Sequence, residues 1–157
     1  MLTGARATFA GLTTRAASMD DLDRLVALDD LCFATRKWPR EAWSEVLLHS
    51  AWRIVLAETA GGELAAAAVL LRDRPLASLA SLAVAPPWRG RGVGACLLGE
   101  CVRLSRAAGA QAVVLEVDED NEPALRLYRR FGFRAYRAFE EDGVARLEMV
   151  LRLDGQK

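Results

Sequence analysis

The sequence predicts an α/β or α+β domain built on a mixed β-sheet, and three observations carry this prediction. The chain has 157 residues, which suits one compact domain, and 52% of them are hydrophobic. The patterns run in a mixed order: helices first, then an antiparallel run of strands, then strand, helix, strand, helix and strand. No internal repeat, low-complexity block or linker divides the sequence. We therefore predict a single domain over residues 12–155, preceded by a disordered or loosely attached tail over residues 1–11.

A strand and two helices are predicted at the start of this domain. Residues 12–16 predict a first strand, and Ser18 after it is a suitable helix N-cap. Apolar side chains then recur with helical spacing over residues 22–32. A second helix is predicted over residues 39–50, because proline is tolerated in the first turn of a helix.

Three strands are predicted next. Residues 54–58 and 64–71 are apolar runs on either side of Gly61-Gly62, a pattern typical of a hairpin. Residues 79–84 predict a further strand, which stops at two consecutive prolines.

The second half alternates between helices and strands. Residues 94–109 predict a long helix with one apolar face and a glycine at its end. Residues 113–117 have the composition of a buried strand, and residues 121–130 predict a short helix. The last two runs, residues 133–139 and 144–153, indicate a closing hairpin around an Asp-Gly turn.

Composition excludes several classes of function. Lys and Arg number 21, and so do Asp and Glu, so no net charge points to nucleic acid or to an anionic membrane as a partner. No apolar run reaches the roughly 18 residues of a membrane span, and we expect a cytoplasmic protein. The start of the chain also resembles a transit peptide, but a short tail is the preferred interpretation. No metal is expected, because Cys32, Cys96, Cys101 and the single His49 have no metal-ligand spacing.

A glycine-rich loop stands between a predicted strand and a predicted helix. Gly90, Gly92 and Gly94 let the backbone approach an anion closely, at a helix N-terminus whose free N–H groups attract negative charge. Arg89 and Arg91 add forked donors, so a pyrophosphate is the natural ligand. The loop lacks the Gly-Lys-Ser/Thr of a Walker motif and fails the Rossmann spacing.

The residue pattern of this loop is more specific than the presence of its glycines alone. Arg89, Gly92 and Gly94 form the pattern Arg-x-x-Gly-x-Gly, which resembles the acetyl-CoA signature of the GNAT superfamily of N-acetyltransferases. The resemblance continues in order through residues 94–109, through Leu115-Glu116-Val117, and through the Asn…Ala-Leu-x-Leu-Tyr…Gly-Phe segment of residues 121–133. In all it covers residues 79–134.

The resemblance implies the GNAT acyl-CoA N-acyltransferase fold, a central, mostly antiparallel sheet flanked by about four helices. In that family two strands, here residues 79–84 and 113–117, splay apart, and the pantetheine arm of acetyl-CoA enters the gap like an added strand. A backbone N–H near Val84 would polarise the thioester carbonyl. Asn121 caps the last helix and in relatives also contacts the cofactor, so both roles stay open. The residues implied to bind acetyl-CoA are Leu82, Ala83, Val84, Arg89, Gly90, Arg91, Gly92, Val93, Gly94, Ala95 and Asn121.

The resemblance also implies a pair of catalytic residues. Many relatives have a glutamate on the strand before the glycine loop, where this chain has only Ser78, Ser81 and apolar residues. Glu116 stands where the ribosomal-protein N-terminal alanine acetyltransferase subfamily has its base, and we expect it to be half-buried. Tyr128 matches the family's general acid. The alternatives are a solvent-facing Glu116 and a Tyr128 that only packs in the core.

The amine acceptor is the least specified part of the prediction. The family's substrate loops correspond to residues 33–39 and 139–143, and two acidic clusters, residues 118–120 and 140–142, would favour a cationic acceptor. A peptide or protein N-terminus, a lysine and a small amine all stay open, because the aromatic cluster and longer insert of the ribosomal-protein subfamily are missing. The expected acceptor-binding residues are Phe33, Trp38, Tyr136 and Phe139.

Two other functions fit the same motifs less well. A module of this fold that binds acyl-CoA without turnover would have no need for Glu116 and Tyr128, and both are present. A nucleotide-binding domain would use the glycine loop for ATP or NAD. We expect acetyl-CoA and an amine acceptor as partners, with a monomer or a homodimer as the assembly.

Overall fold

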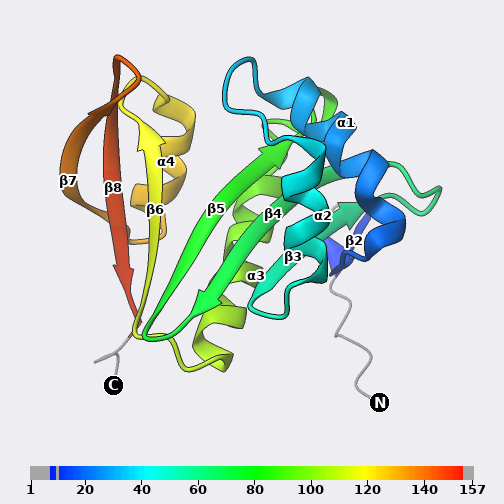
Figure 1. The fold of residues 1–157 in the computed structure, drawn as a ribbon, viewed down its shortest axis with the longest axis horizontal. Coiled ribbons are helices and arrows are strands. Elements are labelled where there is room, and N and C mark those ends of the chain that lie inside the picture. Colours follow the sequence, from blue (N-terminus) through cyan, green and yellow to red (C-terminus); the bar gives the residue numbers. More distant parts are fainter. Residues whose placement is uncertain (1–7, 10, 154–157) are drawn as a thin grey trace.

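The computed structural model describes residues 8–9 and 11–153, which form an eight-stranded mixed sheet with helices on both faces (Figure 1). The strand order is β1-β2-β3-β4-β5-β6-β8-β7, and within these residues β5 and β6 are parallel while the other neighbours are antiparallel. This confirms the predicted mixed, mostly antiparallel sheet. None of the described helices combines the length and the apolar character needed to span a bilayer.

The N-terminal half follows the predicted order. Part of the predicted tail lies outside the described residues, namely 1–7 and 10, but Thr8–Phe9 form a short strand that pairs with Leu12 and Thr13. The elements are β1 (Thr8–Phe9), β2 (Leu12–Ala16), η1 (Met19–Asp21), α1 (Leu22–Cys32), α2 (Arg40–Leu48), β3 (Trp52–Glu58) and β4 (Leu64–Asp73).

The C-terminal half contains the glycine loop and the closing hairpin. Its elements are β5 (Leu76–Val84), η2 (Pro86–Trp88), α3 (Val93–Ala107), β6 (Ala112–Asp118), α4 (Glu122–Arg130), β7 (Arg134–Glu141) and β8 (Val144–Arg152). The hairpin turns at Asp142 and Gly143, whose φ angles of 53° and 79° are the left-handed values that an Asp-Gly pair adopts readily.

The parallel pair of strands separates halfway along its length. Leu76 to Leu79 of β5 pair with Ala112 to Leu115 of β6, and there the ladder ends. Both strands continue beyond it, β5 to Val84 and β6 to Asp118, and they diverge (Figure 1). Beyond this point the main-chain groups on the facing edges of β5 and β6 form no hydrogen bonds with another strand of the described chain, as the family resemblance implied.

Alternate residues of the strands face two separate cores. On β3, Val55 and Ala57 pack with α3 and α4, while Ile54 and Leu56 pack with α1 and α2. Because successive side chains of a strand point to opposite faces, the two helix pairs cover opposite faces of the sheet. The loop between α1 and α2 consequently lies across the sheet from α3 and α4.

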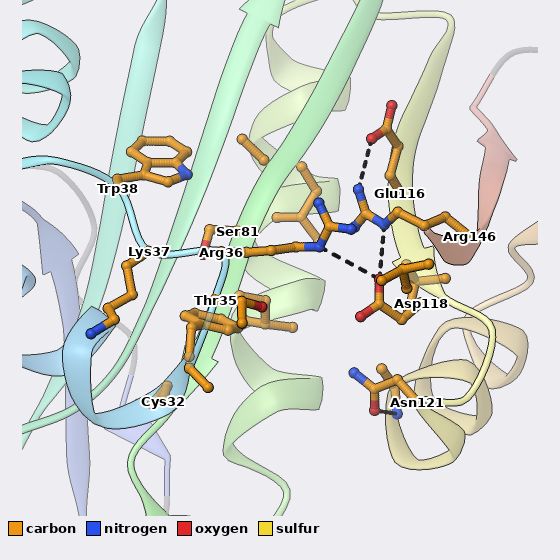
Figure 2. Close-up of a pocket in the computed structure, with 18 of the residues that line it drawn as sticks. Cys32, Thr35, Arg36, Lys37, Trp38, Ser81, Glu116, Asp118, Asn121 and Arg146 are labelled. Carbon is orange, nitrogen blue, oxygen red and sulfur yellow. Dashed lines mark hydrogen bonds and ion pairs between the residues drawn. The ribbon is translucent and has the colours of Figure 1, made fainter. Parts of the chain in front are cut away.

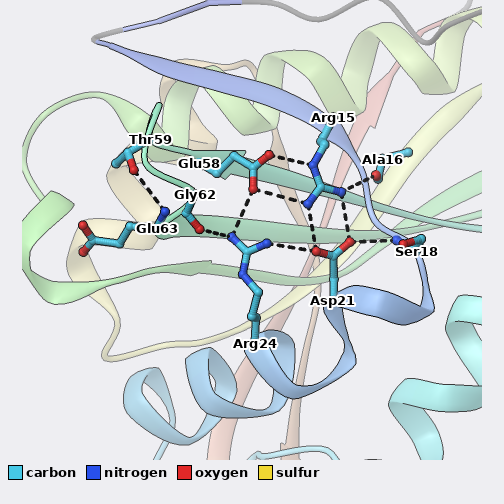
Figure 3. A network of polar contacts seen from close by, with 9 residues as sticks. All are labelled: Arg15, Ala16, Ser18, Asp21, Arg24, Glu58, Thr59, Gly62 and Glu63. Carbon is cyan, nitrogen blue, oxygen red and sulfur yellow. Dashed lines mark hydrogen bonds and ion pairs between the residues drawn. The ribbon is translucent and has the colours of Figure 1, made fainter.

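A network of charged groups fastens the start of α1 to the sheet (Figure 3). Arg15 on β2 contacts Asp21 at 2.8 Å and Glu58 on β3 at 2.6 Å, and Arg24 on α1 contacts both carboxylates at 3.0 Å. Hydrogen bonds from Arg15 lower the pKa values of the Asp21 and Glu58 carboxyls. Asp21 also accepts a hydrogen bond from the Ser18 backbone N–H at 2.9 Å. The network sets the position of α1 and so of the loop that follows it.

Candidate active site

A cavity of about 830 Å³ opens where β5 and β6 separate. Five segments enclose it: the α1–α2 loop, β5, the end of β6, one side of α4 and the start of β8. The lining residues used below are Cys32, Phe33, Arg36, Trp38, Leu82, Glu116, Asp118, Asn121, Tyr128 and Arg146. A smaller space of about 310 Å³ adjoins it and shares Glu116 and Arg146.

The glycine loop lies beyond the end of β5, at the N-terminus of α3. Gly92 is the N-cap with φ of 80°, and Gly90 has φ of 76°, so both use conformations that glycine adopts without strain. The first turn of this 15-residue helix contains no acidic side chain, and its free N–H groups suit an anion. The loop residues 89–95 are outside the lining of the large cavity, as are Ala83 and Val84; of the predicted cofactor residues, Leu82 and Asn121 line it.

The two loop arginines are engaged with neighbouring groups. Arg89 Nε donates a hydrogen bond to the Val84 carbonyl at 2.9 Å, and the Arg91 guanidinium lies over the ring of Trp88 at 5.0 Å. Each guanidinium has five N–H donors, so these contacts leave donors on both side chains in addition to the backbone amides at the helix N-terminus.

Glu116 differs from the sequence expectation of a half-buried base. Its side chain is 46% exposed, and its Oε2 atom lies 3.1 Å from Nη1 of Arg146. The physical reason is the strand alternation on β6: Leu115 and Val117 take the core face, so Glu116 takes the opposite, open face. The solvent-facing alternative therefore describes its position, although the side chain also lines the cavity.

Tyr128 packs in the core and also reaches the cavity. It is buried in the core beside Phe133, with ring centroids 5.7 Å apart, and it lines the cavity from α4. Burial, with a smaller contribution from Cys101, raises the pKa of Tyr128 to about 12. The hydroxyl consequently stays protonated at neutral pH, which a proton donor requires.

The sequence reasoning missed two arginines that meet in the cavity, Arg36 and Arg146 (Figure 2). Arg146 Nε contacts Asp118 at 2.8 Å and its Nη1 contacts Glu141 at 3.1 Å. Arg36 comes from the α1–α2 loop and contacts Glu141 at 2.7 Å. The predicted acidic clusters thus reach the cavity, but the positive charges of Arg36 and Arg146 partly compensate their negative charges. The feature that points to Arg146 is its position on β8 opposite Asp118. This position is known only once the register of the two strands is known.

The aromatic candidates for acceptor binding divide into two groups. Phe33 and Trp38 line the cavity from the α1–α2 loop. Tyr136 is 73% exposed on β7, and neither it nor Phe139 belongs to the cavity lining. The guanidinium of Arg137 lies 4.6 Å from the Phe139 ring centre instead. The structure therefore brings together two of these four residues.

The α1–α2 loop is held by a buried carboxylate. Asp29, 4% exposed, accepts a hydrogen bond from the Trp38 backbone N–H at 2.7 Å. The Trp38 ring packs on Trp43 and Trp52, with centroids 4.7 and 6.2 Å away. Cys32, which the sequence reasoning did not assign to the site, donates from Sγ to the Val84 carbonyl at 3.4 Å. These contacts fix the loop against the end of β5.

Asn121 caps α4 as predicted. Its side-chain oxygen accepts a hydrogen bond from the Ala124 N–H at 3.3 Å, and the residue also lines the cavity. A contact with a bound molecule is compatible with this position, because the side-chain amide group has donors to spare.

Known proteins are similar to this chain in sequence. The profile of the acetyltransferase (GNAT) family matches residues 22–133, more than half of the chain. A mycothiol acetyltransferase of Clavibacter michiganensis is 35% identical over 143 residues, which cover 83% of this chain and 45% of that protein. A Bacillus subtilis protein provisionally named a ribosomal protein bS18-alanine N-acetyltransferase is 27% identical over 120 residues, covering 76% of this chain and 79% of that protein.

A solved structure supports the same relationship at the level of the fold. The ribosomal-protein-S18-alanine N-acetyltransferase of Escherichia coli superposes with a TM-score of 0.82 at 20% identity, covering 90% of this chain and 94% of that one. The chain spans less than half of the length of the mycothiol acetyltransferases it matches. The profile match and the shared fold show that this chain belongs to the GNAT family of acetyltransferases.

Proposed function

We propose that this domain transfers an acetyl group from acetyl-CoA to a primary amine. The observation that carries the proposal is the separation of β5 from β6 beyond Leu79 and Leu115, around a cavity of about 830 Å³. The family uses acetyl-CoA as its acyl donor. An extended pantetheine arm fits the unpaired edge of β5, where the main-chain groups of Leu82, Ala83 and Val84 are its expected partners.

The glycine loop supports the same ligand. The amides of residues 89–95 would hold the pyrophosphate at the N-terminus of α3, where Gly92 lets the backbone approach it. Asn121 would add a polar contact from the other side of the gap. A nucleotide alone would leave the β5 edge unpaired, which is why acetyl-CoA is favoured over ATP or NAD.

Direct attack needs one proton acceptor and one proton donor. Glu116 would take a proton from the acceptor ammonium, directly or through water, and the neutral nitrogen would then attack the thioester carbonyl carbon. As the tetrahedral intermediate collapses, the C–S bond breaks and the nitrogen loses its second proton to solvent. Tyr128 would donate its hydroxyl proton to the departing thiolate of CoA and recover one from solvent. The raised pKa of Tyr128 supports this role, because the hydroxyl is protonated before the thiolate forms.

The ion pair between Glu116 and Arg146 favours one alternative, a module that binds acyl-CoA without turnover. A carboxylate that already contacts a guanidinium must give up that contact before it can accept a proton from the acceptor. The alternative predicts stabilisation by acetyl-CoA without release of CoA in the presence of any amine.

Release of free CoA thiol, measured with a panel of primary amines, tests the proposal. Glu116→Gln and Tyr128→Phe should each lower kcat by ~10²-fold or more, while the dissociation constant of acetyl-CoA stays nearly unchanged. Glu119→Gln is the matched control, since Glu119 is an exposed carboxylate outside the cavity lining. Normal rates in both variants would remove Glu116 and Tyr128 from the mechanism, and amine-dependent release by none of the proteins would favour the binding module.

A further inference from the structure

Two arginines from opposite sides of the cavity share two carboxylates, Asp118 and Glu141, and Figure 2 shows their contacts with Asp118. The Asp118 Oδ1 atom lies 2.8 Å from Arg146 and 3.7 Å from Arg36. The Glu141 Oε1 atom lies 2.7 Å from Arg36 and 3.1 Å from Arg146. The α1–α2 loop is thereby linked to the β7–β8 hairpin, 105 residues away in the sequence. Because this link crosses the cavity, an acceptor that binds Arg36 must take the place of Glu141 on it.

The two arginines are held unequally. Arg146 is 12% exposed and contacts Glu116, Asp118 and Glu141. Arg36 is 32% exposed, with one close partner, Glu141, whose side chain is itself 45% exposed. Exposed ion pairs of this kind contribute little to stability, so another carboxylate can replace Glu141 on Arg36 at small cost. Arg146 is a fixed part of the wall, and Arg36 is the exchangeable cation.

The charges of the cluster suit an acceptor that carries charges of both signs. Three carboxylates, Glu116, Asp118 and Glu141, face two guanidiniums, so the cluster retains one negative charge, which attracts an ammonium group. An acceptor carboxylate would match the fork of the Arg36 guanidinium, which suits a bidentate pair. Glu141, displaced from Arg36, keeps its contact with Arg146 and returns partly to water. Lys37, the next residue of the loop, is directed away from the cluster and lies 3.7 Å from Asp30 (Figure 2).

We propose that the acceptor is a small amino acid, a primary amine beside a free carboxylate, and that Arg36 binds this carboxylate. The inference rests on the proposed acetyl transfer and names its acceptor class. Arg36 holds the carboxylate on the loop side of the cavity, and the amine then lies toward Glu116 on β6. Peptides without a nearby carboxylate and polyamines lack the group that Arg36 recognises.

The test compares acceptors that differ only in the carboxylate. Phenylalanine, phenylalaninamide and phenethylamine form one series, and leucine, leucinamide and isoamylamine form a second; a pentapeptide and spermidine are separate arms. We expect kcat/KM for the amino acid to exceed that for its amide by ~10-fold or more, since a site built around a polar group rejects the analogue that lacks it. Amidation increases the fraction of neutral amine, so this preference cannot come from intrinsic reactivity.

Arg36→Gln should abolish the preference, mainly by raising the KM for the amino acids. Arg36→Lys, which keeps the charge but loses the fork, should retain a small part of it. Arg40→Gln is the matched control: Arg40 is an exposed arginine at the start of α2 that pairs with Asp23, outside the cavity lining, and its loss should leave the preference intact.

Three results would overturn the inference: equal or better transfer to amides, peptides or spermidine, an unchanged preference in Arg36→Gln, or transfer to none of the amino acids. Thermal unfolding of the same protein with acetyl-CoA separates these failures from failure of the proposed function. Stabilisation by acetyl-CoA together with transfer to other amines refutes only the acceptor class. Absence of both stabilisation and transfer refutes the acetyltransferase proposal itself.

Discussion

The Oε2 atom of Glu116 lies 3.1 Å from Nη1 of Arg146, so the predicted base of the site is paired with a cation of the neighbouring strand. The register explains the pair, because Asp118 lies opposite Arg146 and Glu116 is two residues away on the same face of β6. Arg146 thus contacts Glu116 and Asp118 together and orients both carboxylates on the cavity wall. Removal of the Arg146 side chain should therefore lower the free energy of unfolding.

Arg146→Met should lower the free energy of unfolding by about 1–3 kcal/mol, because three carboxylates then lose their shared, largely buried cation. Urea denaturation at low salt measures the loss. Arg137→Gln is the matched control, since Arg137 is 53% exposed and lies 3.4 Å from Glu148; its loss should cost less than about 0.5 kcal/mol. Equal effects of the two substitutions would contradict the arrangement described for Arg146.

The pKa of Tyr128, raised to about 12 by burial, predicts the alkaline behaviour of the enzyme. A tyrosine that acts as an acid is active while protonated, so a raised pKa extends its working range upward. The kcat at saturating substrate should therefore stay level up to about pH 10, the ordinary tyrosine value. In Tyr128→Phe the kcat should be ~10²-fold lower across this range. Suppose that the wild-type kcat falls steeply well below pH 10 and that this fall is absent in Tyr128→Phe. This result would contradict a buried, protonated hydroxyl.

The Asp21 and Glu58 carboxyls predict how stability depends on acid. Both have lower pKa values in the folded protein than the ordinary 3.8 and 4.5, mainly through hydrogen bonds from Arg15. The unfolded chain therefore binds more protons, and the stabilisation, fully present above about pH 5, is lost as pH falls through the folded values. Asp21→Asn should cost about 2–4 kcal/mol at neutral pH and flatten the acid limb of the stability curve.

Asp23→Asn is the control for this network. The Asp23 side chain is 82% exposed and pairs with Arg40, so its loss should change stability by less than about 0.5 kcal/mol. Chemical denaturation between about pH 3 and pH 7 compares the two variants. If stability falls as steeply at low pH in Asp21→Asn as in the wild type, other carboxyl groups cause that fall.

Asp29 tests how firmly the α1–α2 loop is held. Burial raises the pKa of Asp29, so its contribution to stability is greatest at low pH and falls as pH rises through the folded value. Asp29→Asn keeps an oxygen for the Trp38 N–H and should cost little at neutral pH, whereas Asp29→Ala leaves that donor unsatisfied and should cost about 1–3 kcal/mol. Asp30→Asn, at a neighbouring side chain 60% exposed, is the matched control. Equal stability of the alanine and asparagine variants would count against the Trp38 contact.

Gly92 is the glycine of the loop that tolerates a side chain least. A Cβ atom there would lie 3.2 Å from Cζ of Phe9, at a φ of 80°. Gly92→Ala should lower stability by about 1–2 kcal/mol and weaken the binding of CoA. Gly61→Ala is the control, because its added Cβ would meet its nearest neighbour at 3.8 Å without a left-handed φ. Unchanged stability and CoA affinity in Gly92→Ala would contradict the loop geometry.

The local patterns of the sequence were sufficient for most of the fold. Helical periodicity and glycine or proline punctuation located α1, α3 and the two hairpins, because these signals act within a few residues. The glycine loop and the order of the motifs gave the family. Local patterns do not give the pairing and register of strands. The pairing of Thr8–Phe9 with β2, for example, depends on a partner strand and not on propensity.

The cavity was harder to predict than the fold. Alternation on β6 exposes Glu116, and this was weighed only as an alternative. Arg36 and Arg146 meet across a gap of more than a hundred residues of sequence, and no spacing rule connects a loop arginine with a hairpin arginine. Tyr136 and Phe139 seemed suited to the acceptor by residue type, but their strand forms the edge of the sheet, away from the cavity.

Thermal unfolding with acetyl-CoA, CoA, ATP and NAD in parallel shows which of these ligands the domain binds. A ligand at ~100 times its dissociation constant adds ~2.7 kcal/mol, and each kcal/mol raises the Tm of a domain of this size by roughly 2–4 °C. A pantetheine-binding gap between β5 and β6 predicts a rise of several degrees with acetyl-CoA and with CoA, and none with ATP or NAD. No shift with acetyl-CoA at millimolar concentration, or a shift with ATP or NAD alone, would contradict it.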